Sequence, residues 1–267
     1  MSESLSQLLE QVAGIARAAG VEILEVYASG DVAATAKADA SPLTLADLRA
    51  HALIVARLAE LTPGVPVLSE EAAATPFSER SGWQRYWLVD PLDGTREFLA
   101  RNGQFTVNIA LIEGHSPALG VVHVPVTDTT YLGQPGRGAW RGHAGVPAES
   151  IRVALRSASP LRVVGSRSHR GDSLDGFLAR SGPHELVAIG SSLKFCLVAE
   201  GAADVYPRLG PTSEWDTAAA HAVLAAAGGT VSQLDGAPLA YNTRAELLNP
   251  HFVAYGPGDR DWLTLLR

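Results

Sequence analysis

The stretch Tyr86-Trp87-Leu88-Val89-Asp90-Pro91-Leu92-Asp93-Gly94-Thr95 is the strongest structural signal in the chain. It joins an apolar run, typical of a buried strand, to a turn that carries two carboxylates and ends in a Gly-Thr pair. Asp90 and Asp93 stand close together across this turn, so both can converge on one hard cation such as Mg²⁺ or Mn²⁺. The Gly94-Thr95 pair can expose backbone N–H groups to a phosphate at a helix start. A plain surface turn of the same residue types is the alternative.

The composition indicates one large domain or two closely packed ones. The chain has 267 residues, 46% of them hydrophobic, and no apolar run long enough to cross a membrane. It begins without a basic segment followed by an apolar core, so we expect no secretory signal. The net charge of −7 and the lack of a long basic block argue against nucleic-acid binding. The single Cys196 excludes an internal disulfide and fits a reducing cytoplasm.

The first part of the chain predicts two helices followed by a largely antiparallel sheet. Apolar residues at helical spacing begin at Leu5, and Gly20 is the expected end of that helix. A second helix is expected over residues 44–61. Strand-like runs joined by hairpin connections then follow one another at 65–68, 86–89, 105–112, 118–124 and 129–133.

After residue 158 the pattern changes to an alternation of strands and helices. Strands are expected at 162–165, 185–189 and 204–206, and helices near 172–181, 191–200 and 217–227. Such alternation predicts a layered α/β arrangement. We therefore divide the chain into an N-terminal α+β half, residues 1–157, and a C-terminal α/β half, residues 158–267.

Further carboxylates follow predicted strand ends or helix starts. They are Glu70 and Glu71 after one strand, Asp47 in the same helix start as Thr44, and Asp216 before an Ala-rich helix. Each has an ordinary explanation, as a solvated turn, a capping box or an N-cap. Together they supply the ligands that a metal held only by the two Asp side chains of the first turn would lack.

These segments resemble the signature blocks of the lithium-sensitive phosphatases of the inositol monophosphatase superfamily. The blocks are Glu70-Glu71, the turn of residues 90–95 and Trp215-Asp216-Thr217-Ala218-Ala219, in the family's order, with Thr44-x-x-Asp47 as a further element. Within the family the chain is most similar to the bacterial 3′(2′),5′-bisphosphate nucleotidase (CysQ-type) branch, on segments 41–44, 86–95, 105–110 and 190–196. The resemblance implies a layered α/β/α/β/α sandwich of the inositol monophosphatase and fructose-1,6-bisphosphatase type.

The resemblance also implies a role for each acidic residue. Two or three Mg²⁺ ions, with Mn²⁺ as a substitute, would be held by Glu70, Asp90, the Leu92 carbonyl, Asp93 and Asp216. The implied catalytic residues are Asp47, Thr95 and Glu70. Thr95, paired with Asp47, would position the attacking water and help to deprotonate it, so no covalent phosphoenzyme is needed.

The second half carries the expected substrate contacts. Gly190-Ser191-Ser192 follows a strand and opens a helix, which suits a second, non-reacting phosphate. Lys194 and Arg208 would add positive charge, although a solvated lysine and a surface-loop arginine are the alternatives. The full expected set of substrate-binding residues is Asp93, Gly94, Thr95, His169, Gly190, Ser191, Ser192, Lys194, Arg208 and Asp216.

The resemblance implies a Mg²⁺-dependent, Li⁺-sensitive phosphatase that removes the 3′-phosphate of adenosine 3′,5′-bisphosphate, a by-product of sulfate assimilation. An inositol monophosphatase or a fructose-1,6-bisphosphatase-like sugar phosphatase on the same fold is the nearest alternative. An aspartate-nucleophile phosphatase is disfavoured because its two Asp residues stand one residue apart, unlike Asp90 and Asp93. A catalytically silent scaffold is disfavoured because the acidic set is complete. Whether the protein is a monomer or a homodimer, and whether it touches the inner membrane peripherally, stays open.

Overall fold

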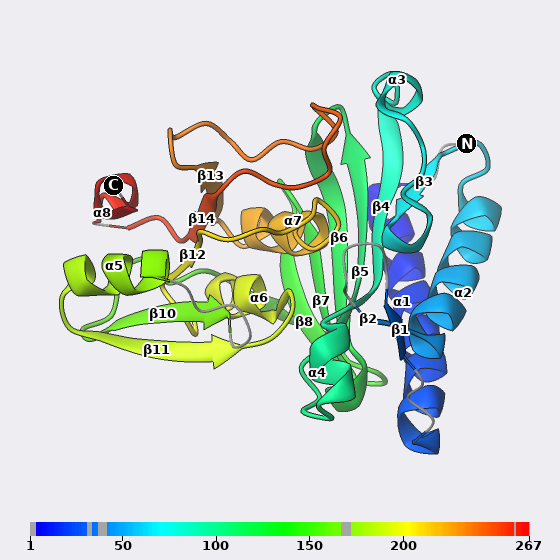
Figure 1. The fold of residues 1–267 in the computed structure, drawn as a ribbon, viewed down its shortest axis with the longest axis horizontal. Helices are drawn as coiled ribbons and strands as arrows, with labels where there is room; N and C mark the ends of the chain where they lie inside the picture. The colour runs from blue at the N-terminus through cyan, green and yellow to red at the C-terminus, as the bar shows by residue number, and fades with distance from the viewer. Residues whose placement is uncertain (1–3, 31–33, 37–41, 167–171, 259, 267) are drawn as a thin grey trace.

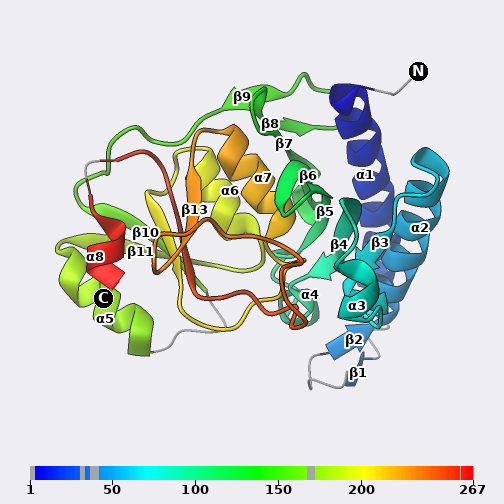
Figure 2. The same cartoon turned by 90° about the horizontal axis from the view of Figure 1, so that it is seen from above.

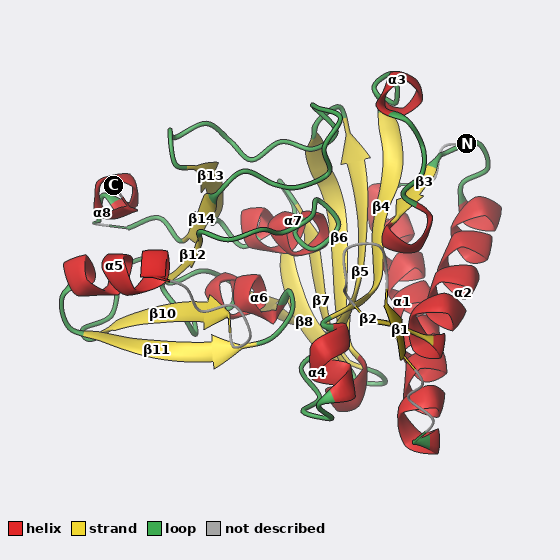
Figure 3. Ribbon diagram, viewed as in Figure 1, coloured by secondary structure: helices red, strands yellow, loops and turns green. Residues whose placement is uncertain are grey.

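The helices and strands form alternating layers in the order helices, sheet, helices, sheet, helices (Figure 1; coloured by element type in Figure 3). The computed structural model describes residues 4–30, 34–36, 42–166, 172–258 and 260–266. The helical layers are α1 (Leu5–Ser29) with α2 (Leu45–Leu61), α6 (Leu193–Ala199) with α7 (Ala218–Ala226), and α5 (Asp172–Ser181) with α8 (Trp262–Leu266). The α/β/α/β/α sandwich implied by the sequence is confirmed.

A seven-stranded meander forms the larger sheet. Its order follows the chain from β3 to β9, and neighbours are antiparallel except β3 and β4. The strands are β3 (Val67–Ser69), β4 (Arg85–Asp93), β5 (Thr106–Glu113), β6 (Ser116–Val124), β7 (Thr129–Gln134), β8 (Gly138–His143) and β9 (Glu149–Ile151). Helices cover both faces (Figure 2), so the central strands read as continuous apolar runs rather than as alternations.

The smaller sheet has five strands in the order β11-β10-β12-β14-β13. They are β10 (Leu161–Ser166), β11 (His184–Ile189), β12 (Val205–Arg208), β13 (Thr230–Gln233) and β14 (Phe252–Tyr255). β10 pairs in parallel with β11 and β12, whereas β14 is antiparallel to both of its neighbours. β13 and β14 are not among the strands predicted from the sequence.

Short elements complete the fold and carry part of the pocket described below. They are β1 (Ala34–Ala36), β2 (Pro42–Thr44), η1 (Glu70–Ala72), α3 (Phe77–Arg80), α4 (Thr95–Leu99) and η2 (Pro125–Thr127). Among the helices in the described ranges, none combines the length and the apolar character needed to cross a membrane.

The long helix α1 passes the glycine at which it was expected to end. It runs to Ser29 and stops at Gly30, whose φ of 73° is left-handed. The prediction that Gly20 ends this helix is wrong, because Gly20 lies inside the helix against β6. A Cβ at Gly20 would stand 2.7 Å from the Nε2 of His123, so glycine here permits close packing of helix on sheet.

Three hydrophobic cores fill the spaces between the layers. One lies between α1, α2 and the larger sheet, one surrounds α6 and α7, and one lies beneath α5 and α8. The helix α7 contacts strands β5 to β8 of the larger sheet and β13 of the smaller one. α7 belongs to the second half of the chain and packs on both sheets, so it connects the two halves. The division of the chain between residues 157 and 158 stays a prediction.

Glycines let α7 approach the larger sheet. A Cβ at Gly120 of β6 would stand 2.2 Å from the carbonyl oxygen of Ala219 in α7. Gly120→Ala should lower the free energy of unfolding by about 1–3 kcal/mol, because the helix must move off the sheet. Urea denaturation measures this loss. In the control Gly14→Ala, the added Cβ has no neighbour within 4 Å, so the helix should be as stable or more stable. Equal losses in both variants would contradict the packing argument.

Candidate active site

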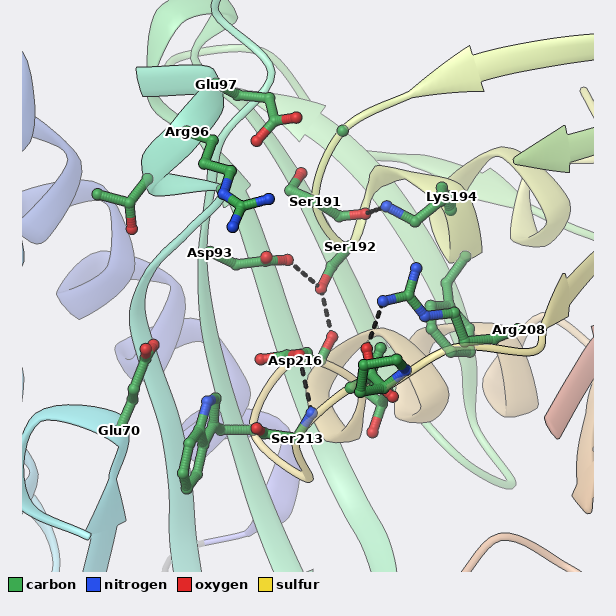
Figure 4. A pocket seen from close by; sticks show the side chains of 18 of the residues that line it. Glu70, Asp93, Arg96, Glu97, Ser191, Ser192, Lys194, Arg208, Ser213 and Asp216 are labelled. Carbon is green, nitrogen blue, oxygen red and sulfur yellow. Dashed lines mark hydrogen bonds between the residues drawn. The ribbon is translucent and has the colours of Figure 1, made fainter. Parts of the chain in front are cut away.

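A pocket of about 390 Å³ lies where the β4–α4 turn faces the β11–α6 turn and the start of α7 (Figure 4). Its acidic wall carries Glu70, Asp93 and Asp216, and its basic wall carries Lys194 and Arg208. Side chains from both halves of the chain therefore line one space.

A break in the strand ladder directs the acidic turn toward this pocket. β4 and β5 lose register between Asp90 and Asp93, and the N–H of Leu92 donates to the Asp90 carboxylate over 3.0 Å. Gly94 follows with a φ of 96°, and a side chain there would crowd the carbonyl of Gln104 at 3.2 Å. The alternative of a plain surface turn does not hold, because Asp90 is buried.

Two side chains, one from the neighbouring strand β5 and one from the β11–α6 turn, hold Asp93. Its Oδ2 accepts hydrogen bonds from Ser192 Oγ at 2.8 Å and from Asn108 Nδ2 at 3.4 Å. Ser192 Oγ also lies 2.6 Å from the carbonyl oxygen of Asp216, so its single hydrogen is shared between two acceptors. This network joins the β4 turn, strand β5, the β11–α6 turn and the start of α7.

The hydroxyl of Thr95 faces the carboxylate of Asp47 at the start of α2. Asp47 Oδ2 accepts from the backbone N–H of Thr44 at 2.8 Å and from its hydroxyl at 2.6 Å, which forms the capping box expected for this helix. Thr95 Oγ1 lies 3.4 Å from Asp47 Oδ1 and 3.4 Å from the carbonyl oxygen of Leu92. The buried Asp47 therefore caps α2 with one oxygen and faces the turn with the other.

The acidic wall has the electrostatics of a cation site. Burial raises the pKa of Asp90 well above its usual range, and neighbouring carboxylates, Glu70 first, raise it further. Burial also raises the pKa of Asp93, and it raises the pKa of Asp216 to about 8. Carboxylates that share a buried space are expected to shift in this way, and such oxygen donors fit Mg²⁺.

The donors share a space without forming a closed cage. Within the described ranges, no three His, Cys, Asp or Glu side chains are already grouped as a metal site. Figure 4 shows Glu70 set apart from Asp93 and Asp216. Beyond the effect of burial, repulsion from Asp93 raises the pKa of Asp90 and of Asp216, and a cation bound between these carboxylates would relieve this repulsion.

The basic wall carries two buried cations and a buried hydroxyl. Lys194 Nζ donates to the carbonyl of Ser191 over 2.5 Å, and burial lowers the pKa of Lys194 to about 8 despite the attraction of Asp93. Arg208 Nη2 donates to the carbonyl of Pro211 over 2.5 Å. The Nε of Arg208 and the Oγ of Ser191 are buried and find no hydrogen-bond partner among the described residues. Because buried polar groups are normally paired, these two atoms point to a polar ligand.

The structure brings most of the predicted site residues to the pocket. Those that line it are Glu70, Asp93, Gly94, Thr95, Gly190, Ser191, Ser192, Lys194, Arg208 and Asp216. Behind this surface, Asp47, Asp90 and Leu92 interact with residues that line it. His169 lies outside the described residues. The catalytic, metal-binding and substrate-binding roles of all these residues stay predictions.

Sequence reasoning missed several residues that the fold adds to the site. Asn108 holds Asp93, and the side chain of Gln104 accepts from the N–H of Gly190 at 3.0 Å. Arg96 and Glu97 line the pocket. Asn108 interrupts an apolar strand and lies in the segment 105–110 that resembles the nucleotidase branch. Both are signals in the sequence, because a buried amide needs partners.

Comparison with known proteins covers nearly the whole chain. The family profile described as "Inositol monophosphatase family" matches residues 4–256. The chain belongs to the inositol monophosphatase family. Members of this family are generally Mg²⁺-dependent.

This inositol monophosphatase family member is similar to bacterial bisphosphate nucleotidases. It is 52% identical over 246 residues to "3′(2′),5′-bisphosphate nucleotidase CysQ" of Escherichia coli (strain K12), covering 92% of this chain and 98% of that one. The protein of the same name from Haemophilus influenzae is 39% identical over 261 residues, or 97% of each chain. The crystal structure of CysQ from Bacteroides thetaiotaomicron matches with a TM-score of 0.84 at 42% identity, covering 96% of this chain and 98% of that one. The resemblance to this branch is confirmed.

Proposed function

We propose that this protein is a Mg²⁺-dependent 3′(2′),5′-bisphosphate nucleotidase, which hydrolyses the 3′-phosphate of adenosine 3′,5′-bisphosphate to give AMP and phosphate. The names of its relatives support this activity, and so do the two walls of opposite charge in the pocket. In a chain of net charge −7, a ligand with two phosphates needs local positive groups. The basic wall supplies them.

The acidic wall, together with Asp90 and the Leu92 carbonyl behind it, is the proposed metal site. Its oxygen donors suit two or three Mg²⁺ ions, or Mn²⁺ in their place, and they are Glu70, Asp90, Asp93, Asp216 and the Leu92 carbonyl. When bound, such ions would supply positive charge that stabilises the reacting phosphate. Ser192 and Asn108 hold the Asp93 carboxylate by hydrogen bonds, so its orientation is fixed before the substrate arrives.

Thr95 and Asp47 orient the attacking water in this proposal. The Thr95 hydroxyl donates toward Asp47 Oδ1, which leaves the lone pairs of Oγ1 to accept a hydrogen bond from water. The water oxygen forms a bond to phosphorus while its proton passes to Thr95 Oγ1 and the hydroxyl hydrogen of Thr95 passes to the Asp47 carboxylate. The bond from phosphorus to the 3′-oxygen breaks, the 3′-oxygen takes up a proton from solvent water, and Asp47 returns its proton to solvent. No bond forms between the protein and the phosphate.

The two unpartnered buried donors, Ser191 Oγ and Arg208 Nε, carry the assignment to a bisphosphate. Ser191 adopts a φ of 51°, an uncommon conformation for a residue other than glycine, and Lys194 binds its carbonyl oxygen. Backbone strain of this kind gathers at ligand sites. Because the scissile phosphate belongs at the acidic wall, the 5′-phosphate needs these separate donors and cations.

Removing either cation should weaken hydrolysis of the bisphosphate selectively. Lys194→Met and Arg208→Met should each lower kcat/KM for adenosine 3′,5′-bisphosphate by about ten- to a hundredfold, the equivalent of about 1.5–3 kcal/mol for one charge-assisted contact. Methionine keeps most of the buried apolar stem. Adenosine 3′-monophosphate never makes the contact, so its kcat/KM should change little. Steady-state phosphate release on both substrates measures the difference.

The matched control is Arg156→Met, which removes an exposed cation outside the pocket lining. It should leave both kcat/KM values unchanged. Equal losses on the two substrates in the Lys194 and Arg208 variants would contradict their role at the second phosphate. A wild-type preference for inositol 1-phosphate or fructose 1,6-bisphosphate would replace the nucleotidase assignment with the sugar-phosphatase alternative.

The cytoplasm is the proposed location, in keeping with a single Cys196 that is buried as a free thiol. The oligomeric state, monomer or homodimer, stays a prediction to be measured together with activity.

A further inference from the structure

The segment 241–249, which we name the C-terminal strap, lies against the turn that carries Asp216. Two backbone hydrogen bonds, of 2.8 and 2.7 Å, close an antiparallel bridge between Ser213 of this turn and Leu248 of the strap. The side-chain amide of Asn249 donates to the carbonyl of Ser213 over 2.7 Å. The strap and the turn therefore form one hydrogen-bonded unit at the edge of the pocket.

A buried polar cluster anchors the other end of the strap. The N–H of Asn242 lies 2.9 Å from both carboxylate oxygens of Glu214. Arg80 Nη1 donates to Asn242 Oδ1 over 2.5 Å, and Asn242 Nδ2 donates to the carbonyl of Arg80 over 2.6 Å. All three residues are 1% exposed. Buried polar groups joined by several hydrogen bonds are costly to separate, so the backbone of the strap is held in place.

Leu248 brings an apolar side chain from this fixed backbone to the pocket. Its side chain is 53% exposed, and it lines the pocket together with Pro211, Thr212 and Trp215. A lone exposed leucine is ordinary on a protein surface, but this one is fixed beside a pocket of charged groups. Those groups suit the phosphates of a nucleotide, whereas the flat face of its base requires apolar surface.

We propose that Leu248 is a specificity-determining residue that packs against the base of the nucleotide substrate. This inference rests on the proposed function, because only a substrate with a base has a surface for Leu248 to contact. Leu248 and its neighbours would then recognise the base through its face.

The test compares adenosine 3′,5′-bisphosphate with its abasic analogue, in which a hydrogen replaces the base. The wild type should prefer the substrate that has the base. Leu248→Ala should reduce this preference, expressed as the ratio of the two kcat/KM values, by about tenfold, because removing hydrocarbon from a pocket contact changes discrimination on that order. The change should appear in KM rather than in kcat, since the base lies away from the reacting phosphorus.

Leu155→Ala is the matched control, because Leu155 is an exposed leucine outside the pocket lining. It should keep the wild-type preference. Leu248→Met restores apolar area and should recover most of the preference, whereas Leu248→Ser should not. An unchanged preference in Leu248→Ala, or an equal loss on both substrates, would overturn the role of Leu248 while the nucleotidase activity stands. A wild type inactive on both bisphosphates would refute the proposed function and this inference with it.

Discussion

Asp93→Asn is expected to lower kcat by roughly 10³-fold or more while leaving the protein folded. Asparagine has the shape of aspartate, but it lacks the charge and can present only one oxygen. In the wild type, Oδ2 accepts from Ser192 and Asn108, and the proposed metal site needs carboxylate oxygen as well. Whichever way the new amide turns, its NH₂ group replaces an acceptor with a donor in one of these two directions.

Thermal unfolding separates a lost metal ligand from a damaged fold. Mg²⁺ that binds only the folded protein should stabilise the wild type by about 2.7 kcal/mol at a hundredfold excess over Kd. The rise in Tm with Mg²⁺ should be much smaller for Asp93→Asn. Asp235→Asn removes the same charge from an exposed turn after β13 and should behave as the wild type. Activity of Asp93→Asn close to wild type at limiting Mg²⁺ would contradict the metal-ligand role.

The acidic turn could be predicted from the sequence because its structure depends on near neighbours. Asp90 binds the N–H of Leu92, and the φ of 96° at Gly94 lets the chain enter α4. The start of α2 is equally local, since Asp47 binds Thr44 in the same helical turn. Contacts between residues two or three positions apart require certain residue types at a fixed spacing, so the sequence predicts them without any knowledge of the fold.

The supports of the site could not be predicted, because they join residues far apart in the chain. Asn108 donates to Ser192 across 84 positions, and Ser192 donates to Asp93 across 99. Arg80 and Asn242, which anchor the C-terminal strap, are 162 positions apart. No local periodicity encodes these pairs. They follow from how the two sheets are packed against the middle helices, which is a property of the whole fold.

The same limit explains the error at Gly20 and the absence of β13 and β14 from the sequence analysis. In a helical pattern, a glycine is read as a stop because of its conformational freedom. Position 20 requires a glycine because the side chain of His123 packs against it. His123 lies on β6, far from Gly20 in the chain, so the local sequence of the helix does not reveal this contact. β13 pairs with β14, and β14 joins the sheet through β12, so neither strand belongs to the strand–helix alternation that predicts the other strands of this sheet.

The hydroxyl of Thr95 is expected to contribute roughly 10²-fold or more to kcat, because it positions the attacking water and connects it to a base. Thr95 Oγ1 has one hydrogen and two acceptors at 3.4 Å, Asp47 Oδ1 and the Leu92 carbonyl. The charge of Asp47 favours donation to the carboxylate. When the hydroxyl donates to Asp47, its oxygen can accept a hydrogen bond from water. Contacts as long as these 3.4 Å distances commonly shorten when substrate binds.

Thr95→Val and Thr95→Ser form the decisive pair of variants. Valine keeps the branched shape and removes the hydroxyl, so kcat should fall with little change in KM, whereas serine keeps the hydroxyl and should retain most of the activity. Asp47→Asn should lower kcat in a similar way, because the hydroxyl loses its charged acceptor and can turn to the Leu92 carbonyl. Full activity of Thr95→Val would rule out positioning by the hydroxyl. Acid-quench trapping of a radiolabelled aspartyl phosphate in the wild type would instead establish an aspartate nucleophile, since direct attack by water leaves no phosphate on the protein.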